Sequence, residues 1–271
     1  MGVIGLVPDG WTIRVTGYLP VDDPLEARLR RVCAALDKFP EPAIHLDEEA
    51  RIVTVDCAQA REVLGDARQV LRPLRITERI VVKPPWDSFE SRPGDIVLEI
   101  DPEAAFGSGL HESTRLCLRA LERHVGHAET AADFGSGTGI LAIAAAKLGV
   151  ARVIAIEAHP ESAGVARANV RRNRVEGQVQ VHCASTLEAV TTPVDLLTAN
   201  LTAEGITARL AAITGRVKQG GVLLFSGMTD QNSQDVERLL PRAGCALIER
   251  SNEGNWVALA AVKTSSTSGR E

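Results

Sequence analysis

This 271-residue sequence lacks the features that would place it in a membrane or direct it out of the cell. No uninterrupted apolar stretch reaches about 18 residues, the length that a membrane-spanning helix needs. Residues 1–8, MGVIGLVP, have neither the basic start nor the length of a secretory signal peptide. We therefore expect a cytoplasmic protein that does not bind a membrane.

The sequence also has few cysteines and no excess of positive charge. The five cysteines, at positions 33, 57, 117, 183 and 245, never form a Cys-x-x-Cys pair, so neither a disulfide framework nor a zinc site is indicated. We expect them to be small buried hydrophobic residues, and we expect no metal site. The net charge of −5 argues against direct nucleic-acid binding over a broad surface and is compatible with a basic protein as substrate.

A glycine-rich turn stands out in the middle of the chain. Residues 131–139 read AADFGSGTG and lead into the apolar run ILAIAAAKL at 140–148. Glycine lets a backbone approach a ligand closely, and a helix N-terminus offers free N–H groups with partial positive charge. The pattern predicts a nucleotide-binding turn in which Gly135, Gly137 and Gly139 contact the cofactor.

The spacing of this turn indicates which nucleotide it binds. A dinucleotide fingerprint would need a third glycine at position 140, where Ile140 stands. Asp133, two residues before the first glycine, would repel a pyrophosphate but suits the ammonium end of S-adenosylmethionine (SAM). The Asp-x-Gly-x-Gly-x-Gly pattern resembles motif I of class I SAM-dependent methyltransferases. Asp133 is therefore a further cofactor-binding candidate, and the alternative is a turn that binds no ligand.

A second acid ends the next predicted strand. Residues 151–157 read ARVIAIE, and Glu157 lies 22 residues after Gly135 (157 − 135 = 22), close to where a Rossmann-type fold places an acid for ribose hydroxyls. A carboxylate offers two acceptor oxygens to two adjacent hydroxyls. We predict that Glu157 binds the ribose; the alternative is a solvated acid at the end of a strand.

The chain divides into three predicted regions: 1–72, 73–264 and a disordered tail at 265–271. The first carries a β-α-β-β-α pattern that predicts a small ferredoxin-like α+β domain. Its expected strands are 11–19, 44–46 and 51–55, and its expected helices are 25–36 and 60–71. Because His45 stands alone there, without a nucleophile or a pair of acids, we expect this domain to recognise the substrate.

The second region alternates strands and helices, as in a Rossmann-like α/β sheet with helices on both faces. Its expected strands are 79–82, 95–100, 151–157, 179–182, 194–200, 222–225, 245–249 and 256–262. Its expected helices are 117–125, 140–148, 159–173 and one that carries Ile206 to Val217 and ends at Gly220-Gly221. A loop of small residues precedes the first helix, which Ser113 or Thr114 would cap. His111 in that loop is either structural or part of a substrate site.

Four segments together resemble the ribosomal protein L11 methyltransferases, which use SAM to methylate amino groups of that protein. They are Phe106–Leu118, Asp133–Gly149, Ala199–Leu201 and Glu253–Val257, and the resemblance spans roughly residues 76–263. It places SAM contacts at Thr114, Gly135, Glu157 and Asn200, with Phe106 of the loop as a further cofactor-binding candidate. By position, Ser185 and Thr186 fall where methyltransferases contact adenine.

Asn200 is the predicted catalytic residue. It ends the strand 194–200, and an open α/β sheet binds ligands at the carboxyl ends of its strands. The enzyme has to align an unprotonated amine and exclude water, and we expect a carbonyl oxygen of Asn200 to hold that amine. The form Asn-Pro-Pro-Tyr, which resembles enzymes that act on planar nitrogens, is replaced here by Asn-Leu-Thr-Ala. This favours an sp³ amine; the alternative is that Asn200 is a turn residue.

Two departures from the family pattern leave the substrate open. Glu157 stands where the family usually has Asp, and residues 61–68 lack the tryptophan-rich segment that usually ends the N-terminal domain. We predict methylation of lysine side chains or the N-terminal amine of a ribosomal protein, L11 above all, either free or on the ribosome. The alternatives are another protein lysine, a small-molecule amine, or a SAM-binding module without catalysis. Oligomeric state is open, with a monomer expected.

Overall fold

The computed structural model describes residues 2–9, 12–18, 43–47, 52–57, 72–101, 105–109 and 111–264. The chain forms two compact units, Met1–Leu71 and Arg72–Glu271. None of the helices in the described ranges is long and apolar enough to cross a bilayer.

The first unit contains a four-stranded antiparallel sheet in the order β1-β2-β4-β3. Its strands are β1 (Gly2–Asp9), β2 (Thr12–Tyr18), β3 (Ala43–Asp47) and β4 (Ile52–Cys57). The last three lie where the sequence predicts strands, and β4 lies between β2 and β3 as in a split βαβ unit. β1 was not predicted, because its apolar residues do not alternate with polar ones. The predicted helices 25–36 and 60–71 lie outside the described residues.

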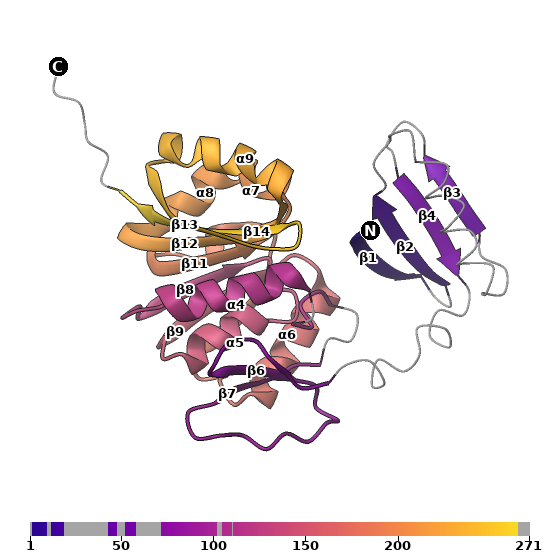
Figure 1. Cartoon of the computed structure of the whole chain (residues 1–271), viewed down its shortest axis with the longest axis horizontal. Helices are drawn as coiled ribbons and strands as arrows, with labels where there is room; N and C mark the ends of the chain where they lie inside the picture. Colours follow the sequence, from indigo (N-terminus) through magenta and orange to yellow (C-terminus); the bar gives the residue numbers. More distant parts are fainter. Residues whose placement is uncertain are drawn as a thin grey trace. The chain divides into compact units, whose positions relative to one another are not determined.

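The second unit is built on a seven-stranded sheet, visible in Figure 1, in the order β10-β9-β8-β11-β12-β14-β13. The five strands from β10 to β12 are parallel, and β14 and β13 continue the sheet antiparallel. Their bounds are β8 Thr130–Phe134, β9 Arg152–Glu157, β10 Val179–Cys183, β11 Val194–Asn200, β12 Val217–Thr229, β13 Cys245–Glu253 and β14 Trp256–Lys263. The Rossmann-like α/β prediction is confirmed.

Helices cover both faces of this sheet (Figure 1). On one side lie α4 (Glu112–His124), α5 (Ile140–Lys147) and α6 (Pro160–Arg172); on the other lie α7 (Ala203–Thr207), α8 (Leu210–Gly215) and α9 (Asp230–Leu239). The faces alternate residue by residue along each strand: Leu196 packs toward the first group and Leu197 toward the second. Strands buried on both faces read as continuous apolar runs, which explains why residues 194–200 show no polar alternation.

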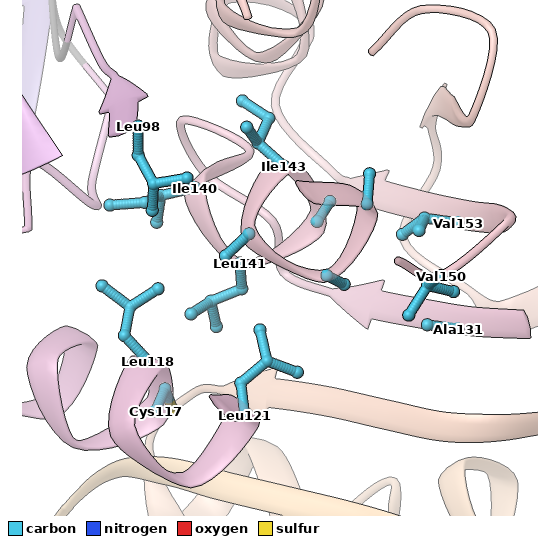
Figure 2. Packing of buried hydrophobic residues seen from close by; sticks show 14 of the residues in the cluster. Leu98, Cys117, Leu118, Leu121, Ala131, Ile140, Leu141, Ile143, Val150 and Val153 are labelled. Carbon is cyan, nitrogen blue, oxygen red and sulfur yellow. The ribbon is translucent and has the colours of Figure 1, made fainter. Parts of the chain in front are cut away.

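A small sheet of β5 (Leu74–Arg75), β6 (Ile80–Lys83) and β7 (Ile96–Glu99) packs against the first group of helices. Figure 2 shows Leu98 of β7 beside Ile140 of α5, with Leu118 of α4 nearby. Burying one such side chain contributes about 1.5–3 kcal/mol relative to leaving it exposed. This cluster fixes the start of α5, and with it the glycine-rich turn.

One predicted helix is wrong in its extent. The stripe from Ile206 to Val217 forms two short helices, α7 and α8, and Val217 begins β12 instead of ending a helix at Gly220-Gly221. Val217 pairs with Val194, and the register then shifts so that Leu196 pairs with Val222. The glycines therefore lie within a long strand rather than at a helix end. Helix α9 was not predicted, and the predicted tail 265–271 lies outside the described residues.

Candidate cofactor and acceptor site

The candidate site lies where the strand order of the large sheet reverses. β9 and β10 extend the sheet on one side of β8, and β11 and β12 extend it on the other. In an open parallel sheet this switch point leaves a crevice at the carboxyl ends of the two central strands. Gly135 follows β8, and Asn200 ends β11.

Three glycines give the turn its shape. Gly135, Gly137 and Gly139 have φ of 78°, 52° and 80°, in the left-handed region that side chains disfavour. A Cβ on Gly137 would lie 2.3 Å from the carbonyl oxygen of Phe106, and one on Gly135 would lie 2.5 Å from Cδ2 of Leu201. These glycines therefore let the turn pack against two neighbouring segments of the protein.

Every backbone N–H from residue 135 to residue 139 has an acceptor within the protein. Gly135 and Ser136 donate to the carbonyl of Ile156 at 2.8 and 3.0 Å, and Gly139 donates to that of Ser136 at 2.8 Å. Gly137 donates to Glu157 Oε2 at 2.9 Å and Thr138 to the Phe106 carbonyl at 2.9 Å. A pyrophosphate-binding turn needs free N–H groups. The geometry therefore disfavours a dinucleotide, in agreement with the presence of Ile140 where a dinucleotide fingerprint has its third glycine.

Asp133 lies behind the turn, and only 1% of its surface is exposed. Oδ1 accepts a hydrogen bond from the Thr198 hydroxyl at 2.6 Å, and Oδ2 accepts one from the Ala142 N–H at 3.2 Å. Burial raises the pKa of this carboxyl to about 6, against the lowering effect of the two hydrogen bonds. Asp133 thus ties β8 to β11 and to the first turn of α5.

Glu157 uses both carboxylate oxygens to fix the turn. Oε2 accepts from the Gly137 N–H, and Oε1 accepts from the His159 N–H at 3.0 Å. The residue is buried. Each carboxylate oxygen can accept a second hydrogen bond, so the side chain keeps capacity for hydroxyl donors.

The loop at 105–109 is attached to the glycine turn through Thr138. Thr138 donates its N–H to the Phe106 carbonyl and its hydroxyl to the Gly107 carbonyl at 2.7 Å. The Phe106 side chain remains 52% exposed, and its ring lies edge-on to the ring of His111, with centroids 5.4 Å apart. An exposed aromatic ring beside the turn can stack on a flat ligand.

His111, rather than Ser113 or Thr114, caps helix α4. Its Nδ1 accepts from the Ser113 N–H at 3.2 Å, so the capping prediction for Ser113 and Thr114 is wrong. Both hydroxyl residues lie inside the first helical turn and are buried. Burial lowers the pKa of His111, which favours the neutral ring, and the hydrogen bond from the Ser113 N–H assigns the accepting nitrogen to Nδ1. Its ring also lies 4.4 Å from that of Trp256, centroid to centroid.

Asn200 contacts Thr114 of helix α4. Its Nδ2 donates to the Thr114 hydroxyl oxygen at 3.4 Å. Its Oδ1 is buried and has no hydrogen-bond partner among the described residues. A buried acceptor left unpaired costs about 1–3 kcal/mol and calls for an explanation at a functional site.

The structure thus brings most of the predicted residues to one edge of the sheet. Ser185 and Thr186 follow β10 at the same edge, and both are exposed. Sequence reasoning missed Thr198 and Leu201, which support Asp133 and Gly135. The signal for Thr198 was available, because it is a polar residue inside an apolar strand that has to pair with β8.

Comparison with known proteins agrees with this geometry. The family model for ribosomal protein L11 methyltransferase (PrmA) matches residues 13–264. A protein of that name from Pelotomaculum thermopropionicum is 40% identical over 248 residues, covering 92% of this chain and 79% of that protein. One from Geobacter metallireducens is 37% identical over 255 residues, covering 90% and 80%.

One solved structure supports the fold comparison. The crystal structure of ribosomal protein L11 methylase from Lactobacillus delbrueckii subsp. bulgaricus superimposes with a TM-score of 0.67 and 27% identity. The match covers 72% of this chain and 100% of that chain.

Proposed function

Because the chain belongs to the ribosomal protein L11 methyltransferase family, we propose that it methylates amino groups of L11, on lysine side chains or at the N-terminus. Family and fold make the chain a SAM-dependent methyltransferase. The observation that carries the proposed chemistry is the unpaired Oδ1 of Asn200, a buried acceptor at the switch point. It provides an acceptor where an incoming amine needs one.

The residues around the turn fit SAM. When bound, SAM supplies a methyl group already activated by its sulfonium. Glu157 keeps acceptor capacity for the ribose hydroxyls, and Phe106 offers an exposed ring. The carboxylate of Asp133 and the fully bonded amides of residues 135–139 favour a cationic amino-acid end over a phosphate. We assign the cofactor-binding role to these residues and to Thr114.

Asn200 is proposed to hold the accepting amine. A lysine ε-amino group has an ordinary pKa near 10.4, so the site has to favour its neutral form. Oδ1 of Asn200 accepts one hydrogen of the neutral amine and directs its lone pair into the crevice. The rings of Phe106, His111 and Trp256 contact one another in series, and in the proposal they shield the bound amine from water, which disfavours the ammonium form.

The first unit is proposed to select the substrate. Every candidate cofactor residue lies after residue 100, and Met1–Leu71 form a separate compact unit. A truncated chain that begins at Pro73 should still bind SAM but methylate intact L11 poorly, because docking supplies the positioning. Full activity of that truncated chain on L11 would remove the recognition role. Replacing residues 1–72 with the matching domain of an established L11 methyltransferase should preserve activity.

We further propose that the protein works as a monomer in the cytoplasm, where L11 is made and assembled, without direct contact with nucleic acid. Size-exclusion chromatography with light scattering tests the monomer, and cell fractionation tests the location. A stable dimer, or a location outside the cytoplasm, would overturn the corresponding part of the proposal.

Labelled SAM and purified L11 test the proposed function. The wild-type protein should transfer label to L11, and mass spectrometry of peptides should place the methyl groups on amines. L11 with every lysine replaced by arginine is the matched control, since it isolates the N-terminal amine. If L11 stays unlabelled while another protein or small amine in a cell lysate takes the label, the substrate assignment is wrong and the alternative substrates are favoured. If nothing is labelled and SAM does not bind, catalysis itself is disproved.

A further inference from the structure

Two buried asparagines, Asn169 in α6 and Asn173 at its C-cap, hydrogen-bond the backbone of a neighbouring extended segment. Asn173 accepts from the Glu99 N–H at 3.0 Å and donates to the Glu99 carbonyl at 2.7 Å. Asn169 accepts from the Asp101 N–H at 3.0 Å and donates to the Asp101 carbonyl at 2.9 Å. Because alternate residues of an extended chain present their backbone groups to the same edge, residues 99 and 101 meet two amides one helical turn apart.

Asn169 makes one further contact that Asn173 lacks. Its Nδ2 also donates to the carbonyl of Thr138 at 3.1 Å, inside the glycine-rich turn. Asn173 instead donates to the Asn169 carbonyl at 2.9 Å, within α6 itself. Asn169 is 0% exposed, so water cannot replace these bonds.

Thr138 is the residue that connects Asn169 to the loop. On its other side, Thr138 donates to the carbonyls of Phe106 and Gly107. Asn169 therefore holds the chain at Asp101, before the loop, and at Thr138, which holds the loop at residues 106–107. The buried side-chain amide of Asn169 therefore connects α6 to both residues that position the loop, Asp101 and Thr138.

We propose that Asn169 is a positioning residue for the cofactor site: it sets the loop at 105–109, and with it Phe106, against the glycine turn. The inference rests on the proposed function, in which Phe106 and the turn contact SAM. Asn169 acts through Thr138 and Asp101 rather than by touching the cofactor.

The test compares Asn169→Ala with two matched variants. Asn173→Ala removes the same kind of side chain at the C-cap of the same helix but leaves the Thr138 contact intact. Gln178→Ala removes an amide that donates to the Ala146 and Val150 carbonyls at 3.3 and 3.2 Å, away from the turn. All three variants keep the ion pair in which Arg172 contacts Asp101 at 3.2 Å.

Calorimetry with S-adenosylhomocysteine should show that Asn169→Ala weakens binding by about tenfold or more, equal to about 1.4 kcal/mol. Asn173→Ala and Gln178→Ala should change it much less. Hydrogen exchange of the Thr138 amide, measured without ligand, should accelerate only in Asn169→Ala, because that amide reports on the loop contact. A loss of global stability alone would affect all three variants alike.

Equal effects of Asn169→Ala and Asn173→Ala on binding and exchange would overturn the proposal. If Asn169→Ala does not fold, Thr138→Val serves in its place, because it removes the hydroxyl bond by which Thr138 holds Gly107 of the loop. This variant should weaken the binding of S-adenosylhomocysteine in the same way. Unchanged binding would overturn the proposal. Failure of the wild-type protein to bind S-adenosylhomocysteine would instead disprove the proposed function, while hydrogen exchange would still test the role of Asn169.

Discussion

The two walls of the crevice are built in opposite ways. On the wall formed by β8 and β9, every turn amide from 135 to 139 and both oxygens of Glu157 have partners within the protein. On the wall formed by β11, the Asn200 side chain donates one long hydrogen bond at 3.4 Å, and its buried Oδ1 has no partner in the part of the chain that the structure describes. The first wall is complete without a ligand, whereas the second lacks a hydrogen-bond donor.

We propose that the two walls divide the work of binding and catalysis. A turn whose hydrogen bonds are already made needs little reorganisation when it binds a cofactor, which favours affinity. An unpaired acceptor lowers the stability of the free protein and gains its partner only when the second reactant arrives, which favours turnover. Variants of the first wall should therefore change cofactor binding, and variants of the second should change the chemical step.

The largest effect should come from Gly137→Ala. The new Cβ would lie 2.3 Å from the Phe106 carbonyl at a φ of 52°, so loop and turn cannot both keep their places. We expect loss of SAM binding and a clear fall in melting temperature. Gly149→Ala is the matched control, because Gly149 has a φ of 110° but open space around its Cβ position; it should cost only about 1–3 kcal/mol of backbone strain. Equal effects of the two variants would show that the close packing of turn and loop does not matter.

The next effect concerns pH. Asp133 has a folded pKa of about 6 against an ordinary 3.8, so the folded state binds the proton more tightly than the unfolded state. The free energy of unfolding should therefore fall by about 2 kcal/mol between pH 4 and pH 6 and level off above about pH 7. Asp133→Asn should lack this decline. Urea unfolding of both proteins over this pH range checks it, and parallel curves would contradict the raised pKa.

A smaller effect is expected at Glu157. Glu157→Ala should weaken SAM binding by roughly 1–3 kcal/mol, the scale for losing charge-assisted hydrogen bonds. Turnover at saturating SAM should fall much less. Glu157→Gln keeps one acceptor oxygen, so its affinity for SAM should lie between those of the wild-type protein and Glu157→Ala. If the affinity for SAM is unchanged while turnover collapses, Glu157 acts in catalysis and the ribose-binding role is wrong.

The sequence allowed the glycine turn and the position of Glu157 on the first wall to be predicted, but not the internal hydrogen bonds that the turn makes. The residue type alone indicates positive φ at Gly135, Gly137 and Gly139. The strand that ends at Glu157 places that acid beside the turn. These are local signals, set by spacing along the chain. For the same reason the strands β9, β10 and β11 and the helices α5 and α6 were predicted close to their observed bounds.

The rest depended on contacts between distant parts of the chain. His111 caps α4 although its residue type rarely does, because Phe106 and Trp256 enclose its ring and burial lowers its pKa. The Thr138 bond to Asn169 joins residues 31 positions apart. The unpaired oxygen of Asn200 could not be predicted from residue spacing, because it depends on which donors the folded chain places within reach of Oδ1.

The most direct test of the divided crevice is Asn200→Ala, measured for both binding and turnover on purified L11. We predict that kcat falls by about 100-fold while the dissociation constant of S-adenosylhomocysteine changes little. Thr114→Val, which removes the partner of Nδ2 but leaves Oδ1, should lower kcat less. A loss of cofactor affinity with kcat preserved would show that Asn200 binds the cofactor, and would contradict the proposed division between the two walls.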